Sequence, residues 1–334
     1  MSSRDFTLSR GKTFAFALIV VLAFFGVLEL GARLSGLDAA AAPRILLRRM
    51  DVDITFPFMQ ADRELFWAPA PGFRGRFLER QVAINSFGVR GPEPARSSDA
   101  IRLLSFGDSI TFGYGVADDE TYPAAMGRAL AARGVEVVNA GVTGYTSHQV
   151  LGLVRRLAPR LQPRLVTICI GWNDGNRRAV DDREWARRLS LASPLGGAME
   201  HVALFRAMTN LYVRSVVSAD KRSGAATQRV PLAHYRENLT SIVAVCRASG
   251  AVPTFVDLPH VQPLPASLNR TYRDALLETS RALEVPLLSV GNLGLDSPRH
   301  DTGELFIDAL HLRPEGNAQL GQLLARQLVE RGLV

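Results

Sequence analysis

The stretch Leu103-Leu104-Ser105-Phe106-Gly107-Asp108-Ser109-Ile110 is a short apolar segment that ends in a glycine, an acid and a serine. Its apolar part predicts a buried strand. Gly, Asp and Ser are common in the turn or helix cap that follows a strand. A serine directly after a strand is also how a chain presents a nucleophile. The stretch alone fits both explanations, so the rest of the sequence has to separate them.

From residue 101 onward, strand and helix signals alternate along the chain. We expect strands at 101–106, 135–138, 165–170, 252–258 and 285–290, and helices at 121–133, 148–161, 233–249, 269–283 and 314–331. Residues 175–230 interrupt this rhythm, and we interpret them as an insertion with helical pieces such as 202–217. The alternation predicts an α/β domain at 101–334 with a parallel sheet covered on both faces.

The amino-terminal segment TFAFALIVVLAFFGVLELGA, residues 13–32, contains one charged residue, Glu29. About 20 residues at roughly 1.5 Å each match the thickness of the membrane hydrocarbon, so the segment predicts a transmembrane anchor. A cleaved signal peptide is the alternative, because residues 39–42 offer an A-x-A site after a basic start. The apolar stretch is long for a signal core and the alanines lie well beyond its end, which favours an uncleaved anchor.

Basic residues lie on both sides of this segment, so they do not fix its orientation directly. Long translocated domains largely escape the positive-inside count. We therefore expect residues 1–12 to form a cytoplasmic tail, and the chain to cross the inner membrane once. The α/β domain would then face the periplasm or the cell exterior.

Residues 33–100 connect the anchor to the α/β domain. Residues 39–43 have the composition of a spacer, and residues 94–99 that of a polar hinge. The segments 65–73 and 82–92 contain too many aromatic residues for a disordered linker. They predict a small packed lead-in of short strands and turns.

The net charge of +7 comes from arginines scattered along the chain, with lysine only at Lys12 and Lys221. A phosphate-binding footprint should cluster on one face, so we expect no nucleic-acid partner. Cys169 and Cys246 lack metal-ligand spacing, and we interpret them as buried free thiols, with a disulfide left open. The sequence has no HExxH motif, Cys/His cluster or phosphate loop, so we expect no metal and no cofactor.

Four segments of the α/β region, in the same order, resemble sequence blocks of the GDSL or SGNH hydrolases. They are FGDSITFGYG (106–115, first block), VVNAGVTGYT (137–146, second), ICIGWNDGN (168–176, third) and IDALHLRPEGNAQLGQLLA (307–325, fifth). Ile110 stands where the name GDSL has leucine, a conservative change. The anchor and the lead-in also resemble membrane-anchored bacterial members. The resemblance implies a flavodoxin-like three-layer α/β/α sandwich and esterase or acyl-transfer chemistry.

The resemblance implies that Ser109 is the nucleophile and that Asp308 and His311 complete a triad. The residues support the same roles. Ser109 follows the first strand, at the sheet edge where ligands bind in open parallel sheets. A serine hydroxyl needs a base such as His311. In a bent segment, an aspartate three residues earlier can reach the imidazole and fix its tautomer. The alternative is that Asp308 only caps the last helix.

A second Asp-x-x-His pair, Asp257 and His260, also follows a predicted strand, so spacing alone cannot choose between the two pairs. The amphipathic helix after His311 favours the later pair, as in the fifth block. His260 is followed by a rigid Val-Gln-Pro loop. It could line the pocket, but we expect it to be a solvated loop residue.

Negative charge on an attacked carbonyl requires hydrogen-bond donors that are already in place. By analogy with the family, these are the backbone N–H of Ser109, the backbone N–H of Gly144 and the side-chain amide of Asn173. Gly144 lets the backbone approach a substrate, although it could serve only a turn. Asn173 could form only an Asx-turn. We expect Asp108 and Asp174 to hold their loops through backbone hydrogen bonds.

These observations predict a membrane-anchored serine esterase that hydrolyses carboxylic esters, O-acetyl groups on envelope carbohydrate above all, through an acyl-enzyme on Ser109. The expected partners are a small ester or acylated carbohydrate and, through the amino-terminal helix, the membrane. The first alternative is an O-acyltransferase that modifies a cell-surface polysaccharide with the same residues. The second is a non-catalytic carbohydrate-binding envelope protein, against which the intact residue set argues.

Overall fold

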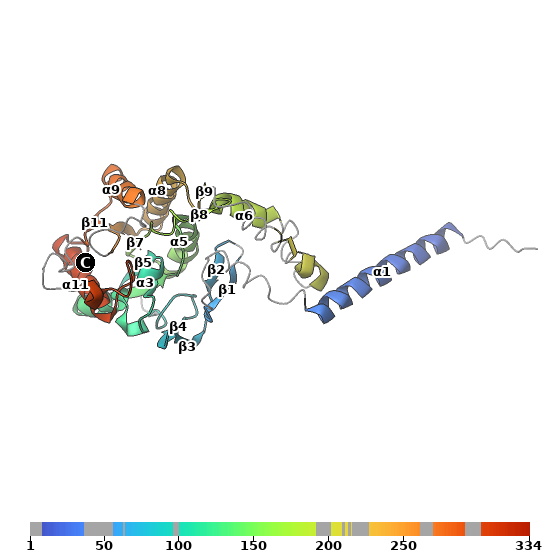
Figure 1. The fold of residues 1–334 in the computed structure, drawn as a ribbon, viewed down its shortest axis with the longest axis horizontal. Helices are drawn as coiled ribbons and strands as arrows, with labels where there is room; N and C mark the ends of the chain where they lie inside the picture. Colours follow the sequence, from blue (N-terminus) through green and yellow to red (C-terminus); the bar gives the residue numbers. More distant parts are fainter. Residues whose placement is uncertain are drawn as a thin grey trace, which may run out of the picture.

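The computed structural model describes residues 9–36, 56–62, 64–95, 100–191, 202–208, 211–212, 215, 227–260, 270–290 and 302–334. The predicted spacer at 39–43 lies outside these residues, as do most of the predicted tail and most of the predicted polar hinge. Figure 1 shows an α/β body with a long amino-terminal helix that extends away from it.

The body is built on a five-stranded parallel sheet. Its strands are β5 (Ile101–Gly107), β6 (Val135–Gly141), β7 (Leu165–Cys169), β10 (Val252–Val256) and β11 (Leu287–Leu288), in the spatial order β6-β5-β7-β10-β11. This is the flavodoxin-like order 2-1-3-4-5. The direction of the strand order reverses between β5 and β7. At such a switch point, ligands bind beyond the carboxyl ends of the strands.

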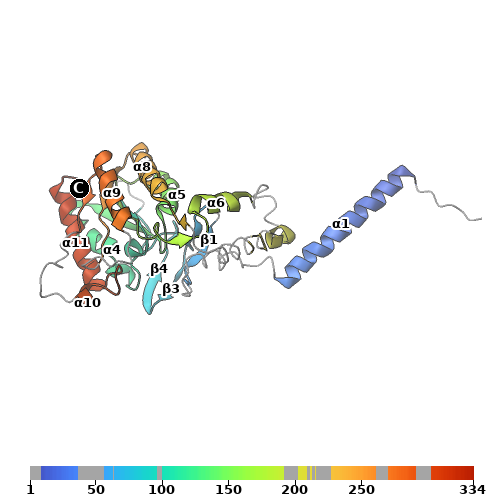
Figure 2. The same ribbon diagram turned by 45° about the horizontal axis from the view of Figure 1, so that its top comes forward.

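Helices cover both faces of the sheet (Figures 1 and 2). Helix α4 (Tyr122–Leu130) packs against α11 (Pro314–Glu330), whereas α5 (Ser147–Leu161) packs against α8 (Leu232–Ala248), and α8 against α9 (Arg270–Ala282). Leu103, Leu104 and Phe106 of β5 are fully buried. A strand that is apolar on both faces needs cover on both faces. The predicted three-layer sandwich is confirmed.

The expected helix at 121–133 consists of α4 and a short 3-10 turn, η3 (Ala131–Arg133). The Thr121 hydroxyl accepts a hydrogen bond from the N–H of Ala124, and Pro123 occupies the first turn. Gly134 ends the segment in the left-handed region, at φ 69°. Thr121 and Gly134 therefore set the start and the end of this segment.

The lead-in consists of two antiparallel pairs, β1 (Met59–Asp62) with β2 (Phe66–Pro69), and β3 (Arg74–Phe77) with β4 (Arg80–Ala83). Its apolar residues belong to the same core as those of the α/β body. The ring of Phe58, for example, stacks on Phe112 at a centroid distance of 4.9 Å. The lead-in is therefore packed onto the α/β body.

Helix α1 (Arg10–Ser35) ends at Gly36 in the left-handed region, and almost all of its apolar side chains are exposed. Its length and composition suit a membrane span or a signal sequence. The two ends of the predicted insertion are joined by the antiparallel pair β8 (Arg177–Arg178) and β9 (Thr227–Gln228). Between them lie α6 (Asp182–Leu191) and a helical turn at 203–208.

Candidate active site

Ser109 lies just past the carboxyl end of strand β5, where it begins the one-turn helix α3 (Ser109–Phe112). Asp108 caps this helix, because its Oδ1 accepts the N–H of Ile110 at 3.0 Å. A Cβ at Gly107 would come within 2.0 Å of Thr111 Oγ1 and 2.5 Å of the carbonyl oxygen of Cys169. Glycine therefore allows the strand and the turn to pack closely enough to place Ser109 at the sheet edge.

His311 contacts both Ser109 and Asp308. The distance from His311 Nε2 to Ser109 Oγ is 2.8 Å, and that from His311 Nδ1 to Asp308 Oδ2 is 2.7 Å. The Asp308 segment is a bend before α11, closed by a hydrogen bond from the N–H of Ile307 to the carbonyl of His311. Asp308 Oδ1 accepts the N–H groups of Leu310 and His311, both at 2.9 Å. This Asx-type turn explains how a three-residue spacing brings the carboxylate to the imidazole.

The charge state of Asp308 sets the tautomer of His311. Partial burial raises the pKa of Asp308, but hydrogen bonds and charge from His311, with the N–H of Leu310, outweigh this and lower the pKa to about 2. Asp308 is therefore a carboxylate at neutral pH and accepts a hydrogen bond from Nδ1–H. A neutral imidazole then turns its Nε2 lone pair toward the Ser109 hydroxyl, as a general base must.

Tyr114 packs against the imidazole of His311, a contact that the sequence analysis missed. The ring centroids lie 4.5 Å apart, and Tyr114 in turn packs edge-on against Phe77 of the lead-in. Its position in the first block, five residues after Ser109, is the signal that was available. Tyr114 therefore limits the movement of the imidazole by packing against its ring.

Ser109 and Gly144 each have a free backbone donor within the part of the chain that the structure describes. Neither N–H donates a hydrogen bond to another described residue. Gly144 follows β6 and has φ 78°, a conformation that favours glycine. The Asn173 amide nitrogen lies 3.0 Å from the carbonyl oxygen of Tyr145 and 3.3 Å from Asp108 Oδ2. The three expected donors thus follow the carboxyl ends of β5, β6 and β7.

Asp108 and Asp174 are buried beside these donors. Burial raises the pKa of Asp108 to about 6, against the opposing effects of the Ile110 N–H and the charge of His311. Burial raises the pKa of Asp174 to about 7, despite hydrogen bonds from the hydroxyl and N–H of Ser147. The predicted loop-holding hydrogen bonds of both residues are present.

The alternative Asp-x-x-His pair does not form a hydrogen-bonded pair among the described residues. Asp257 accepts two hydrogen bonds from Arg273, at 2.7 and 2.6 Å. His260 Nδ1 contacts the carbonyl of Leu258 at 2.8 Å, and its ring packs edge-on against Trp172. The expectation of a solvated His260 is wrong, because the side chain is only 8% exposed. Trp172, which follows the neighbouring strand β7, covers the His260 ring. The sequence around His260 does not reveal this contact.

Among the described residues, the other histidines and the two cysteines form no hydrogen bond with Ser109, His311 or Asp308. His148 stacks on Phe66, and burial lowers its pKa. His201 and His300 lie outside the described residues. Cys169 and Cys246 are both buried and free. Within the described ranges no group of three or more His, Cys, Asp or Glu side chains could hold a metal ion.

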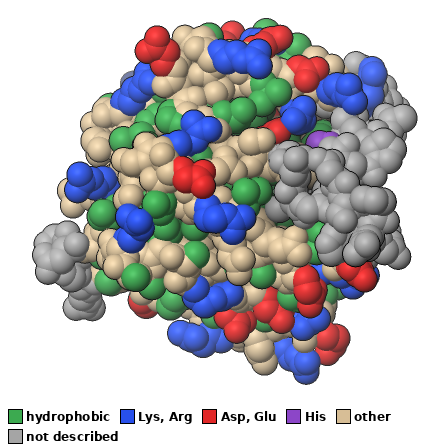
Figure 3. Space-filling model, turned by 90° about the vertical axis from the view of Figure 1, so that its left-hand side faces the viewer, with side chains coloured by type: hydrophobic (Ala, Val, Ile, Leu, Met, Phe, Trp, Pro, Cys, Tyr) green, Lys and Arg blue, Asp and Glu red, His purple; other side chains and the backbone are tan. Residues whose placement is uncertain are grey.

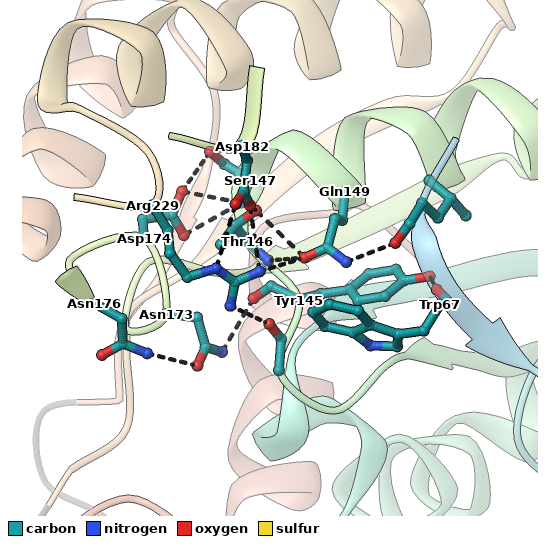
Figure 4. A network of polar contacts seen from close by, with 12 residues as sticks. Trp67, Tyr145, Thr146, Ser147, Gln149, Asn173, Asp174, Asn176, Asp182 and Arg229 are labelled. Carbon is teal, nitrogen blue, oxygen red and sulfur yellow. Dashed lines mark hydrogen bonds and ion pairs between the residues drawn. The ribbon is translucent and has the colours of Figure 1, made fainter. Parts of the chain in front are cut away.

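Figure 4 shows a buried polar network that the sequence patterns did not predict. Its centre is Arg229, just after β9, which pairs with Asp182 and contacts Gln149 and the carbonyl of Gly144. Trp67 of the lead-in donates a hydrogen bond to the Thr143 carbonyl of the same loop. On the outer surface, by contrast, basic and acidic side chains are interspersed on the face drawn in Figure 3.

Part of the chain is similar in sequence to known proteins. The model of the GDSL-like lipase/acylhydrolase family matches residues 105–319. A thioesterase 1/protease 1/lysophospholipase L1 of Escherichia coli K12 is 37% identical over 82 residues, which is 25% of this chain and 39% of that protein. An arylesterase of Vibrio mimicus is 34% identical over 85 residues, 25% of this chain and 42% of that protein.

The chain therefore matches about two fifths of the length of these curated relatives. Among solved structures, the psychrotrophic esterase EstA of a Pseudoalteromonas species, inhibited by monoethylphosphonate, has 16% sequence identity and a TM-score of 0.45. The match covers 70% of this chain and 98% of EstA.

Proposed function

The chain belongs to the GDSL-like lipase/acylhydrolase family, and we propose that it hydrolyses carboxylic esters through an acyl-enzyme on Ser109. The observation that carries the proposal is the continuous chain of hydrogen bonds from Ser109 through His311 to Asp308. Each link has the direction that nucleophilic catalysis requires, because Asp308 fixes the Nδ1–H tautomer and leaves Nε2 free to accept the serine proton.

In the first half-reaction, Ser109 Oγ attacks the ester carbonyl carbon while its proton passes to His311 Nε2. The carbonyl oxygen gains negative charge and is stabilised by the N–H groups of Ser109 and Gly144 and by the Asn173 amide. The tetrahedral intermediate collapses, the C–O bond to the leaving alcohol breaks, and His311 returns the proton to that alcohol. Water then repeats the sequence on the acyl-enzyme, and it releases the acid and free Ser109.

The proposed substrates are O-acetyl esters on carbohydrate of the cell envelope. The support for this choice is the apolar helix α1, which would hold the α/β body next to the envelope polymers. We propose that α1 crosses the inner membrane once, with residues 1–12 in the cytoplasm and the α/β body on the periplasmic side. An acyltransferase would use the same residues, with a sugar hydroxyl in place of water in the second half-reaction.

The test is hydrolysis of an aryl acetate and of acetylated xylan by the full chain in detergent, with Ser109→Ala as the matched variant. We expect release of acetate by the wild type and a loss of about 10⁴-fold or more in Ser109→Ala. Acetate transferred to an added unacetylated polysaccharide, rather than released, would identify the acyltransferase. Activity that survives in Ser109→Ala, or a wild type inactive on every ester, would contradict the proposal.

A further inference from the structure

We infer that Trp67 of the lead-in and Arg229 at the end of the insertion are positioning residues for the oxyanion donor Gly144. Both lie outside the four sequence blocks, and each hydrogen-bonds a main-chain carbonyl next to the Gly144 N–H. The inference rests on the proposed function, because it assigns a role in stabilising the intermediate of that reaction.

Three consecutive carbonyl groups of the loop after β6 accept side-chain hydrogen bonds from three different parts of the chain. Thr143 accepts from Trp67 Nε1 at 3.1 Å, Gly144 from Arg229 Nη1 at 2.8 Å, and Tyr145 from Asn173 Nδ2 at 3.0 Å. These contacts are drawn in part in Figure 4. The loop is therefore held from the lead-in, from the insertion and from the third sequence block at once.

Peptide planarity connects these contacts to the donor. The N–H of Gly144 and the carbonyl of Thr143 belong to one rigid, trans peptide unit, in which they point in opposite directions. The hydrogen bond from Trp67 to that carbonyl therefore sets the direction of the Gly144 N–H. Arg229 holds the next peptide unit through the Gly144 carbonyl. Together the two side chains fix both peptide planes around Gly144.

Gly144 needs such support because its own conformation provides little. With φ 78° it occupies a region that only glycine adopts easily, and glycine also moves easily out of it. A donor stabilises a developing oxyanion most when it is already aligned and needs no reorganisation during the reaction. Contacts that remove this freedom therefore act on the transition state as well as on the fold.

Arg229 is itself rigidly held. Its side chain is almost completely buried, and it pairs with the buried Asp182 at 3.2 Å. One terminal nitrogen also donates to Gln149 Oε1 at 2.8 Å. The main chain adds hydrogen bonds from the Asp182 N–H to the Arg229 carbonyl and from the Arg229 N–H to the Asn176 carbonyl, both at 2.7 Å. A planar guanidinium with several fixed partners delivers its remaining N–H in one direction.

Trp67 is fixed equally well. Its neighbour Phe66 adopts φ 68°, an unfavourable conformation for a bulky residue that persists only where the surroundings impose it. The Leu65 carbonyl accepts from Gln149 Nε2, and the Trp67 carbonyl from the Tyr145 hydroxyl, both at 2.7 Å. The Arg229 guanidinium lies 5.6 Å from the indole ring. The two positioning residues thus contact each other as well as the loop.

The experiment compares Trp67→Phe and Arg229→Lys with wild type, using the full chain in detergent and an aryl acetate. Trp67→Phe removes the N–H donor and keeps an aromatic ring, whereas Arg229→Lys keeps the charge and removes the planar fork. The control is Arg102→Lys. Arg102 also combines a carboxylate partner, Glu136, with a main-chain carbonyl, but it lies at the opposite edge of the sheet. Active sites are counted by stoichiometric labelling with a fluorophosphonate.

We expect kcat per labelled site to fall about 10-fold to 100-fold in each variant, with KM changed less than about twofold, because only transition-state stabilisation is lost. Arg102→Lys should keep kcat per labelled site. Variants that lose labelled sites but keep kcat at the remaining sites would overturn the inference, since the residues would then serve the fold alone. If Arg229→Lys does not fold, the result for Trp67→Phe alone decides between a positioning role and a role in the fold. Failure of both to give labelled protein would also overturn it.

Failure of the proposed function gives a different result. In that case the wild type itself neither hydrolyses the ester nor reacts with the fluorophosphonate at Ser109, and the inference falls with the function on which it rests. An active wild type with unaffected variants overturns the positioning roles alone.

Discussion

Asp308 uses its two carboxylate oxygens for different purposes. Oδ1 accepts hydrogen bonds from two backbone N–H groups and so shapes the bend, while Oδ2 accepts a hydrogen bond from the imidazole N–H of His311. The same side chain therefore builds the turn and orients the imidazole of His311. Asp257 also has both oxygens engaged, but by the guanidinium of Arg273. The two Asp-x-x-His pairs look alike in sequence and differ in the partners that the fold gives them.

The first prediction compares Asp308→Asn with Asp257→Asn. Asparagine at 308 can keep the turn through its oxygen, but it removes the charge and offers an N–H to Nδ1, which favours the wrong tautomer of His311. We expect kcat for an aryl acetate to fall by about 10³ to 10⁴, with a melting temperature close to that of the wild type. Asp257→Asn, the matched control, should lose stability and change kcat per folded molecule only a few-fold. A larger loss of kcat in Asp257→Asn would move the proposed triad to the other pair.

Sequence could nominate individual residues but not their surroundings. Ser109, His311 and Asp308 stand in motifs whose spacing has a chemical meaning, and the structure brings their side chains within hydrogen-bonding distance. The burial of His260 was not predictable, because its neighbour Trp172 comes from another strand end. Trp67 and Arg229 were missed for a similar reason. Their partners lie 76 and 85 positions away, and no local pattern marks a side chain that supports a distant carbonyl.

At the scale of elements, periodicity and caps predicted the strands and helices of the α/β body well. Buried strands were visible as unbroken apolar runs, as in Leu165–Cys169. Strand order was supplied by the family resemblance, because apolar runs do not reveal their neighbours. The aromatic lead-in was predicted to pack, but its contact with the loop after β6 was not. That contact depends on the turn at Phe66, which sequence rules disfavour.

The second prediction concerns the start of α5, where Asp174 accepts hydrogen bonds from Ser147. Its folded pKa of about 7 lies above the ordinary 3.8. Between these values the folded chain holds a proton that the unfolded chain has lost. The free energy of unfolding should therefore fall as pH rises toward 7, by up to about 1.4 kcal/mol per pH unit. Asp108, with a pKa of about 6, adds a similar dependence at lower pH.

Urea unfolding of the full chain between pH 5 and pH 8 measures this dependence. Asp174→Asn keeps an oxygen acceptor and cannot ionise, so its free energy of unfolding should vary less with pH than that of the wild type, most clearly between about pH 5 and pH 6. The exposed Asp119 provides the control, and Asp119→Asn should retain the wild-type slope. Equal slopes in the wild type and Asp174→Asn would show that Asp174 does not carry the buried proton.

At the scale of the whole molecule, the part of the chain before the α/β body contacts the insertion at a defined place (Figures 1 and 2). Glu29 of α1 accepts the N–H groups of Ala203 and Leu204, at 2.9 and 2.8 Å, and so caps the helical turn at 203–208. Ala32, Ala203 and Ala207 pack together beside it. A carboxylate at a helix start is favoured by the unpaired N–H groups and by the helix dipole.

The third prediction tests this contact with Glu29→Leu in the full chain, reconstituted in vesicles. The substitution removes both hydrogen bonds and leaves α1 apolar enough to span the membrane. The contact of Glu29 with the turn is charge-assisted. Its loss makes the population of molecules with an undocked insertion roughly tenfold larger. Trypsin should therefore cleave after Arg206 about tenfold faster. Glu29→Gln keeps an acceptor oxygen, so its cleavage rate should lie between those of Glu29→Leu and the wild type. The value of kcat should be unchanged, because Glu29 contacts the insertion at Ala203 and Leu204 and, among the described residues, forms no hydrogen bond with Ser109, His311 or Asp308. Identical cleavage rates in all three proteins would mean that α1 and the insertion are not docked in the reconstituted protein.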